Sequence, residues 1–303
     1  MSLPLVVAPA VAAALESGQP VVALESTIIS HGLPRPRNLE AARGFEAILS
    51  GMGVTAATVA ILDGVLKVGL TDDELVRIAS EDIAKVSVRD LPVVIARKAS
   101  GATTVAATSY IASLAGVRVF STGGLGGVHR GANETFDESA DLPILSETPI
   151  TVVSAGVKSI LDIRATLERL ETLSVTVVGF GTDEFPSFWL TTSGQTLDWS
   201  VLDAAAVANI MAANDDLGRR SAILVANPLP IEEQLDPAVH DAALAEALRA
   251  ADAEALTGKE VTPFLLAKMV EITGGDSLEV NLRIAANNIR VGGEIAKAWA
   301  GRS

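Results

Sequence analysis

One lysine near the middle of the chain stands where a nucleophile could be placed. Lys158 follows the run Val152-Val-Ser-Ala-Gly-Val157, so its stem leaves the chain among apolar and small side chains. A lysine that is desolvated there exposes a nucleophilic amine. The alternative is an ordinary lysine at a helix start, whose stem packs on the surface while its ammonium reaches water.

A glutamate at the end of an apolar run is the matching candidate acid. Glu25 closes the segment Pro20-Val-Val-Ala-Leu-Glu25 and has no polar residue before it. Burial raises the pKa of a carboxyl group and makes it a proton donor. The alternative is a carboxylate that accepts hydrogen bonds from the Ser26 and Thr27 backbone.

Three carboxylates, Asp137, Glu138 and Asp141, lie within five residues beside Ser139. Oxygen ligands of this kind suit Mg²⁺ or Mn²⁺, which often take one or two carboxylates together with water and substrate oxygens. A solvated acidic turn is the alternative. The preceding glycine-rich run, 123–127, has neither dinucleotide-binding nor Walker spacing, and we interpret it as a tight turn that brings His129 over the strand ends.

The remaining candidates are weaker. His129 is a candidate proton relay or base contact, or else a packed structural residue, and the three histidines are too scattered for a histidine metal site. Lys85 and a helix start at 101–104 are the best phosphate candidates, because they join a cation to a helix N-terminus. The segment 273–276 with Asn281 forms either a second ligand edge or a helix stop followed by a cap.

The elements that must position these residues alternate between strands and helices. Apolar runs predict strands at 20–25, 57–62, 65–70, 117–121, 150–154, 175–179 and 222–226, and helical spacing predicts helices at 8–17, 39–52, 105–114, 159–173, 201–213 and 237–256. Asp63-Gly64 predicts a hairpin, Asn38 a helix cap, and residues 181–199 an aromatic-containing excursion. This alternation is typical of an α/β fold with a largely parallel sheet and helices on both faces, which we interpret as one domain, 1–303.

The position of the candidate residues follows from that fold. Ligands of open α/β sheets lie beyond the carboxyl ends of the strands. The glycine-rich run, the carboxylates and Lys158 all follow predicted strands. We therefore expect them to meet at one edge of one sheet.

Composition excludes several other classes of protein. With 37 acidic against 23 basic residues, the chain lacks the basic stripe that nucleic-acid binding needs. It has no cysteine, which excludes disulfides, thiolate nucleophiles and cysteine-ligated metal sites. No run of about 18 apolar residues and no secretory signal are found, so we expect a soluble cytoplasmic protein without a membrane partner.

Taken together, these stretches resemble the pseudouridine-5′-phosphate glycosidase family, also called the indigoidine synthase A-like family. The resemblance covers nearly the whole chain, and several of its words have eight or more residues. The matching words are Val22-Ala-Leu-Glu-Ser-Thr-Ile-Ile-Ser-His-Gly32, Lys85-Val-Ser87, Arg89-Asp-Leu91, Gly101-Ala-Thr-Thr-Val-Ala-Ala-Thr108, Thr122-Gly-Gly-Leu-Gly-Gly-Val-His-Arg-Gly131, Thr135-Phe-Asp-Glu-Ser-Ala-Asp-Leu142, Ser154-Ala-Gly-Val-Lys-Ser-Ile-Leu-Asp162, Asn227-Pro228, Gly258-Lys-Glu-Val-Thr-Pro-Phe-Leu-Leu266 and Thr273-Gly-Gly-Asp-Ser-Leu278.

The resemblance implies a three-layer α/β/α sandwich around a largely parallel mixed sheet, assembled as a homotrimer. It also implies reversible cleavage of pseudouridine 5′-phosphate to uracil and ribose 5-phosphate through a lysine Schiff base, with Mn²⁺ or another divalent ion. Position by position, Lys158 matches the nucleophile, Glu25 the proton donor and Asp137 the metal ligand. The matching substrate-contacting positions are Lys85, Val105, Ser139, Ala140 and Asp141, with His129, Thr122 and Asn281 in matching motifs.

This sequence departs from the family pattern at Glu138, where an apolar residue is expected. An extra carboxylate beside Asp137 would alter metal affinity if it pointed inward. Two other functions are alternatives. One is a Schiff-base lyase or glycosidase of the same fold that acts on another phosphorylated sugar, and the other is a phosphosugar-binding regulator without catalysis.

Overall fold

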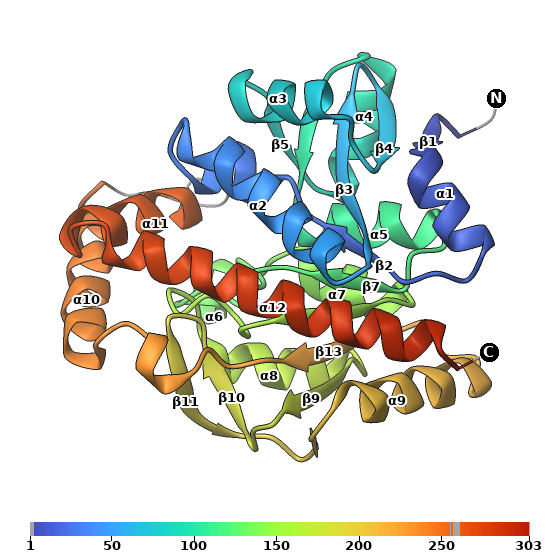
Figure 1. Ribbon diagram of the computed structural model, residues 1–303. Coiled ribbons are helices and arrows are strands. Elements are labelled where there is room, and N and C mark those ends of the chain that lie inside the picture. Colours follow the sequence, from blue (N-terminus) through green and yellow to red (C-terminus); the bar gives the residue numbers. More distant parts are fainter. Residues whose placement is uncertain (1–2, 255, 257–260, 303) are drawn as a thin grey trace.

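A mixed sheet lies at the centre of the computed structural model, which describes residues 3–254, 256 and 261–302 (Figure 1). Its main path runs β1 (Leu5–Val7), β4 (Val65–Val68), β3 (Thr55–Leu62), β2 (Val21–Leu24), β7 (Val119–Ser121), β8 (Thr151–Ser154), β13 (Ile223–Ala226), β9 (Thr176–Phe180) and β12 (Ser200–Val201). Strands β5 (Ala84–Val86) and β6 (Gly101–Thr103) branch off at β3. Only β3 pairs antiparallel, with β4 and β6, among the described strands of this sheet. The largely parallel mixed sheet predicted from the sequence is confirmed.

Helices cover both faces of this sheet. One layer holds α2 (Arg37–Gly51), α9 (Ala204–Asp216) and α12 (Asp276–Ala300), and the other holds α1 (Pro9–Glu16), α5 (Val105–Leu114), α7 (Asp141–Glu147) and α8 (Ile163–Thr172). Alternation along β2 supplies both cores, because Val22 packs in the cluster that contains Ile289, whereas Ala23 packs in the cluster that contains Ile111. The structure therefore has the three layers that the resemblance implies.

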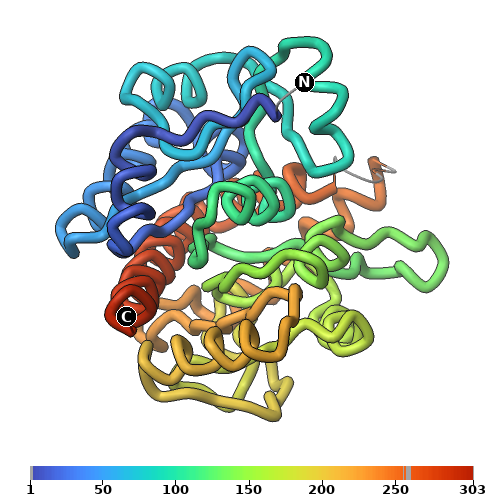
Figure 2. Tube along the Cα trace, turned by 90° about the vertical axis from the view of Figure 1, so that its right-hand side faces the viewer, coloured from blue at the N-terminus to red at the C-terminus, as the bar shows by residue number. Residues whose placement is uncertain are grey.

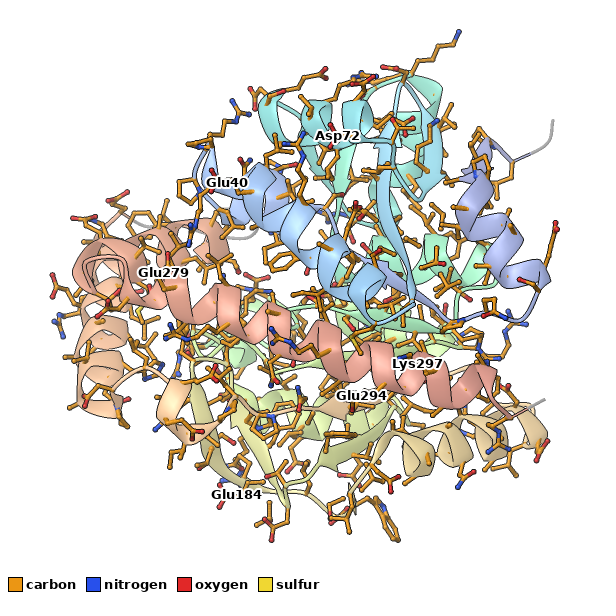
Figure 3. The ribbon with its side chains drawn as sticks, viewed as in Figure 1. Glu40, Asp72, Glu184, Glu279, Glu294 and Lys297 are labelled. Carbon is orange, nitrogen blue, oxygen red and sulfur yellow. The ribbon has the colours of Figure 1, made fainter. Side chains whose placement is uncertain are left out.

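The longest helix, α12, joins the two halves of the molecule. Figure 2 looks roughly along it from its carboxyl end, with the N-terminal half of the chain on one side and the later strands on the other. Near its start, Glu279 accepts from Arg37 of α2 at 3.1 Å, and Figure 3 labels Glu279 on α12 and Glu40 on α2. The remaining helices are η1 (Ile28–Gly32), α3 (Asp72–Ser80), η2 (Val88–Asp90), α4 (Leu91–Ala96), α6 (Ala132–Thr135), η3 (Ile231–Glu233), α10 (Pro237–Ala253) and α11 (Val261–Ile272).

The predicted hairpin is confirmed, but some element boundaries were wrong. Asp63 and Gly64 both have positive φ in the turn between β3 and β4. Helix α2 begins at Arg37, so Asn38 lies inside it and is not its cap; the Asn38 amide donates to two backbone carbonyls and its Oδ1 accepts from Leu39 N at 2.9 Å. Helix α8 begins at Ile163 rather than at 159, since the Asp162 carboxylate accepts from Ala165 N and caps it there.

Two further segments differ from the expectation. Residues 101–103 form strand β6, and Thr104 then caps α5, which begins at Val105 as predicted. The excursion at 181–199 contains an antiparallel pair, β10 (Glu184–Ser187) and β11 (Leu190–Thr196), with Phe185, Phe188 and Trp189 buried around their connection. The matching word at 258–266 and the predicted helix at 237–256 extend in part outside the described residues. Within the described ranges, no helix has both the length and the apolar content that crossing a membrane requires.

Candidate active site

Three neighbouring parallel strands deliver the candidate catalytic residues to one edge of the sheet. Glu25 follows β2, Thr122 follows β7, and Lys158 follows β8 by four residues. The strands are adjacent, with Leu24 beside Ser121 and Ser121 beside Val153. The expectation that these residues meet at one sheet edge is confirmed.

A cavity of about 360 Å³ opens at this edge. Its lining includes ten of the eleven predicted site residues, namely Glu25, Lys85, Val105, His129, Asp137, Ser139, Ala140, Asp141, Lys158 and Asn281. The eleventh, Thr122, lies behind the cavity wall and is bonded to Glu25. The structure thus brings the residues together, while their chemical roles stay predictions.

The glycine-rich run continues the sheet and holds Lys158 at both its backbone and its amine. Leu125 N donates to Gly156 O at 2.9 Å, and Lys158 N donates to Leu125 O at 3.2 Å. The Lys158 Nζ donates to Gly124 O at 2.8 Å. The amine therefore has a fixed position on the cavity wall, with its stem among buried residues.

Glu25 is a partly buried carboxyl group at the end of β2. Burial raises its pKa above the ordinary value, and the Lys158 ammonium, the largest opposing influence, acts in the other direction. The Thr122 hydroxyl donates to Glu25 Oε1 and also favours the charged form. A carboxyl group with a raised pKa, facing a lysine amine, suits a proton donor.

Asp141 ties two elements together beneath the cavity. Its Oδ1 accepts from Ala106 N of α5 at 2.9 Å, and its Oδ2 accepts from Gly126 N at 2.8 Å. Only glycine fits at 126, because a Cβ there would lie 2.7 Å from Ser139 Cβ and 2.8 Å from Asp141 Oδ2. Asp141 therefore sets the distance between the glycine-rich run and α5.

Among the residues that the structure describes, the Val105 amide at the start of α5 has no acceptor. Ala106 N is occupied by Asp141, and Ala107 N points to the capping Thr104 hydroxyl at 3.4 Å. Val105, the first residue of the helix, lines the cavity. An anion bound here would use Val105 N and a nearby cation rather than a whole helix terminus.

Lys85 is that nearby cation. Burial lowers its pKa, and the Lys158 ammonium lowers it further, whereas Asp141 and Glu25 act in the opposite direction. His129, on the same cavity, has a pKa lowered by burial and partly restored by Asp137. The site thus places two lysines and four carboxylates, Glu25, Asp137, Glu138 and Asp141, around one partly desolvated cavity.

Asp137 is the carboxylate that remains available to a metal ion. The Glu138 carboxylate lines the same cavity but accepts from Arg169 Nε of α8 at 2.9 Å, and Asp141 accepts from two backbone amides. Asp137 Oδ2 lies 3.8 Å from His129 Nδ1. No cluster of three or more candidate metal ligands occurs in the part of the chain that the structure describes. A hard divalent ion that keeps most of its waters fits one carboxylate of this kind.

Several residues of the site were missed by the sequence interpretation. Asn288 of α12 is fully buried, and its amide donates to Thr122 O at 2.7 Å and to Gly123 O at 3.2 Å. Its Oδ1 accepts from Asn227 at 2.8 Å. His31 and Phe188 also line the cavity. A polar residue in the apolar stripe of a helix is the signal that could have identified Asn288.

The chain matches the family model described as "Indigoidine synthase A like protein" over residues 10–298. A pseudouridine-5′-phosphate glycosidase of Frankia alni is 57% identical over 98% of this chain and 83% of its own length. Proteins of the same name are 54% identical in Saccharopolyspora erythraea, over 99% of both chains, and 58% identical in Salinispora tropica, over 96% and 91%.

Two solved structures have the same fold as this chain. The prealnumycin C-glycosynthase AlnA, in complex with ribulose 5-phosphate, superposes with a TM-score of 0.91 at 37% identity, over 99% of this chain and 98% of the other. An indigoidine synthase A-like protein of Thermotoga maritima gives 0.89 at 36%, over 98% and 97%. The chain is therefore a member of the indigoidine synthase A-like family.

Proposed function

We propose that this protein is a glycosidase that cleaves the C-glycosidic bond of pseudouridine 5′-phosphate to give uracil and ribose 5-phosphate. The observation that carries the proposal is the placement of the Lys158 amine and the Glu25 carboxyl group on one cavity, with Lys85 beside them. The names of relatives that are 54–58% identical support the choice of substrate.

The reaction needs a nucleophile, because a carbon leaving group is not released by protonating oxygen alone. In the proposed sequence the neutral Lys158 amine bonds to C1′ of ribose, and Glu25 gives its proton to the ring oxygen as the C1′–O4′ bond breaks. The nitrogen lone pair then forms a C=N bond as the C1′–C5 bond breaks, and uracil C5 takes a proton. Water hydrolyses this Schiff base and returns the free amine and ribose 5-phosphate.

Binding energy from the phosphate would position C1′ near the amine. Lys85 and Val105 N are the donors that suit the phosphate, and Ser139 to Asp141 form the adjoining wall. Asp137 would hold a divalent ion, which we propose to be Mn²⁺, and that ion would supply positive charge that orients the phosphorylated substrate.

The same steps run in reverse would join ribose 5-phosphate to uracil, with loss of one water. A solved relative at 37% identity carries the name of a C-glycosynthase, which supports a family chemistry in which C–C bonds are also made. The homotrimer and the cytoplasmic location stay predictions, to be tested by light scattering and by cell fractionation.

The deciding experiment is borohydride trapping with ribose 5-phosphate and Mn²⁺, followed by mass spectrometry of the intact protein. The expected result is a ribose-phosphate adduct on the wild type, mapped to the peptide that carries Lys158, and none on Lys158→Ala. In parallel, chromatography should detect uracil released from pseudouridine 5′-phosphate.

Three other outcomes would contradict parts of the proposal. An adduct that survives in Lys158→Ala would mean that another lysine is the nucleophile. Ligand binding without any adduct or turnover would indicate a binding protein. Trapping of ribose 5-phosphate without release of uracil would indicate that the aglycone is a different one.

A further inference from the structure

Residues 122–124 connect the candidate proton donor to the candidate nucleophile. The Thr122 hydroxyl donates to Glu25 Oε1, and two residues later Gly124 O accepts from Lys158 Nζ at 2.8 Å. The position of this short segment therefore bears on the carboxyl group and on the amine at the same time.

The side chain of Asn288 binds the middle of this segment. Its Nδ2 donates to Thr122 O at 2.7 Å and to Gly123 O at 3.2 Å. Its Oδ1 accepts from Asn227 Nδ2 at 2.8 Å, so both polar atoms of the amide are used. The backbone N of Asn227 donates in turn to Ser154 O at 2.8 Å. The Asn288 amide thus connects the carboxyl ends of β7, β8 and β13.

A close approach of α12 to β7 brings this amide to the edge of the sheet. Helix α12 packs against β2, β7 and β8 (Figure 1). One turn after Asn288, a Cβ on Gly292 would lie 2.0 Å from Ser121 Oγ, so the close approach requires glycine there. The Ser121 hydroxyl also donates to Asn288 O at 3.1 Å. Backbone and side chain of Asn288 are therefore both fixed against the end of β7.

The segment depends on this amide for one of its carbonyls. Among the residues that the structure describes, Asn288 is the only donor to Thr122 O, whereas Gly123 O also accepts from Ala155 N at 3.0 Å. Asn288 is fully buried. A buried amide is stable only where its hydrogen bonds are made, so the side chain has one orientation, towards the two carbonyls.

We propose that Asn288 is a positioning residue for the reaction: it fixes residues 122–124, and through them the distance between the Glu25 carboxyl group and the Lys158 amine. The inference rests on the proposed function. Asn288 does not line the cavity, so it acts on the reacting groups through this segment and not through the substrate.

Asn288→Leu tests the bonds to the segment, because leucine has a similar shape and no hydrogen-bonding group. We expect kcat for uracil release to fall by about tenfold to 100-fold, since a misplacement of about 1 Å at a positioned site costs about 100-fold in rate. KM should change by less than about twofold, because the proposed phosphate donors, Lys85 and Val105 N, lie on β5 and α5 and are not bonded to Asn288. A loss of stability alone does not produce this difference between kcat and KM.

Ile295→Ala is the matched control on the same helix. Ile295 is fully buried about two turns after Asn288, in the apolar core and outside the cavity lining. This change should lower the midpoint of urea unfolding and leave kcat and KM unchanged. Asn288→Asp is the second variant, for the case that Asn288→Leu does not fold. It keeps the volume and the acceptor for Asn227 but loses the N–H donor, and it should give the same fall in kcat.

Three results would overturn the inference. The first is a folded Asn288 variant with kcat within about twofold of the wild type, and the second is a rise in KM that accounts for the whole loss in kcat/KM. The third is an equal fall of kcat in Ile295→Ala.

Borohydride trapping with ribose 5-phosphate separates this inference from the proposed function. If the wild type formed the adduct but released no uracil, the proposed aglycone would be refuted. The trapping rate would then decide the inference, and it should fall in Asn288→Leu by about tenfold or more. A wild type that neither forms the adduct nor releases uracil would refute both.

Discussion

The bridge made by Asp141 can be tested by adding one methyl group at Gly126. Gly126 does not have a positive φ, so an alanine could adopt its backbone conformation without strain. The effect of Gly126→Ala therefore comes from the contacts of the added Cβ alone. The new Cβ would lie 2.7 Å from Ser139 Cβ, whereas ordinary contact begins near 3.4 Å. The segment from Ser139 to Asp141 must therefore move by about 0.7 Å, the difference between these two distances.

That shift predicts losses in both activity and stability. A misplacement of 1 Å at a positioned site costs about 100-fold in rate, so we expect kcat/KM to fall by about tenfold to 100-fold, or about 1.4 to 2.7 kcal/mol. The bond from Gly126 N to Asp141 Oδ2, now 2.8 Å, would be weakened or lost. Its loss should lower the free energy of unfolding by about 1.5 to 3 kcal/mol.

The assays are the rate of uracil release and urea unfolding. Gly44→Ala is the matched control, because Gly44 lies inside α2 with nothing within 4 Å of an added Cβ. That change should raise the free energy of unfolding by about 0.5 to 1 kcal/mol and leave kcat/KM unchanged. If Gly126→Ala were folded with unaltered kcat/KM, the reasoning that Asp141 and Ser139 need this close approach would be refuted.

Three other predictions follow from buried groups of the site. Burial raises the pKa of Glu25 in the folded protein above 4.5, so its contribution to the free energy of unfolding is fully present below pH 4.5 and is lost as the pH rises through the folded-state pKa. Glu25→Gln should abolish uracil release, and urea unfolding measured at acid and at alkaline pH should no longer show this decrease in the free energy of unfolding. Burial lowers the pKa of Lys85, so its charge destabilises the fold at neutral pH, and this destabilisation disappears as the pH rises towards 10.5. Lys85→Met should therefore raise the free energy of unfolding, and it should also raise KM. An unchanged KM would exclude the contact between Lys85 and the phosphate. Phe188→Ala should lower the free energy of unfolding by about 3 to 5 kcal/mol, because the buried ring lies against Gly124, the residue whose carbonyl holds the Lys158 amine.

The central part of the site was predictable because it depends on local order in the chain. Apolar runs that end in polar residues identify strands, and parallel strands bring their carboxyl ends together, so Glu25 and Lys158 could be placed at one edge. The helix 105–114 was predicted with the boundaries that it has in the structure. In both cases the deciding residues are neighbours in the sequence.

What was missed depends on contacts between distant segments. Strand β11 is mostly polar and only partly buried, so its sequence lacks the apolar alternation of a strand, and its position follows from the burial of Phe185 and Trp189. The predicted helix at 159–173 was extended too far because apolar residues before Asp162 continue the helical spacing. In the structure those residues form a turn, in which Leu161 N donates to Lys158 O.

The buried amide of Asn288 has a consequence for the order in which the protein becomes active during synthesis. It holds the carbonyls of Thr122 and Gly123, and so the start of the segment that fixes the Lys158 amine, from a position 166 and 165 residues further along the chain. On the ribosome, the strands of the sheet and Lys158 are synthesised well before Asn288, whose amide supports this segment. A nascent chain that has not yet released α12 would carry a complete set of catalytic side chains around an unsupported loop. Turnover should therefore begin only after α12 has been made and has packed against the sheet.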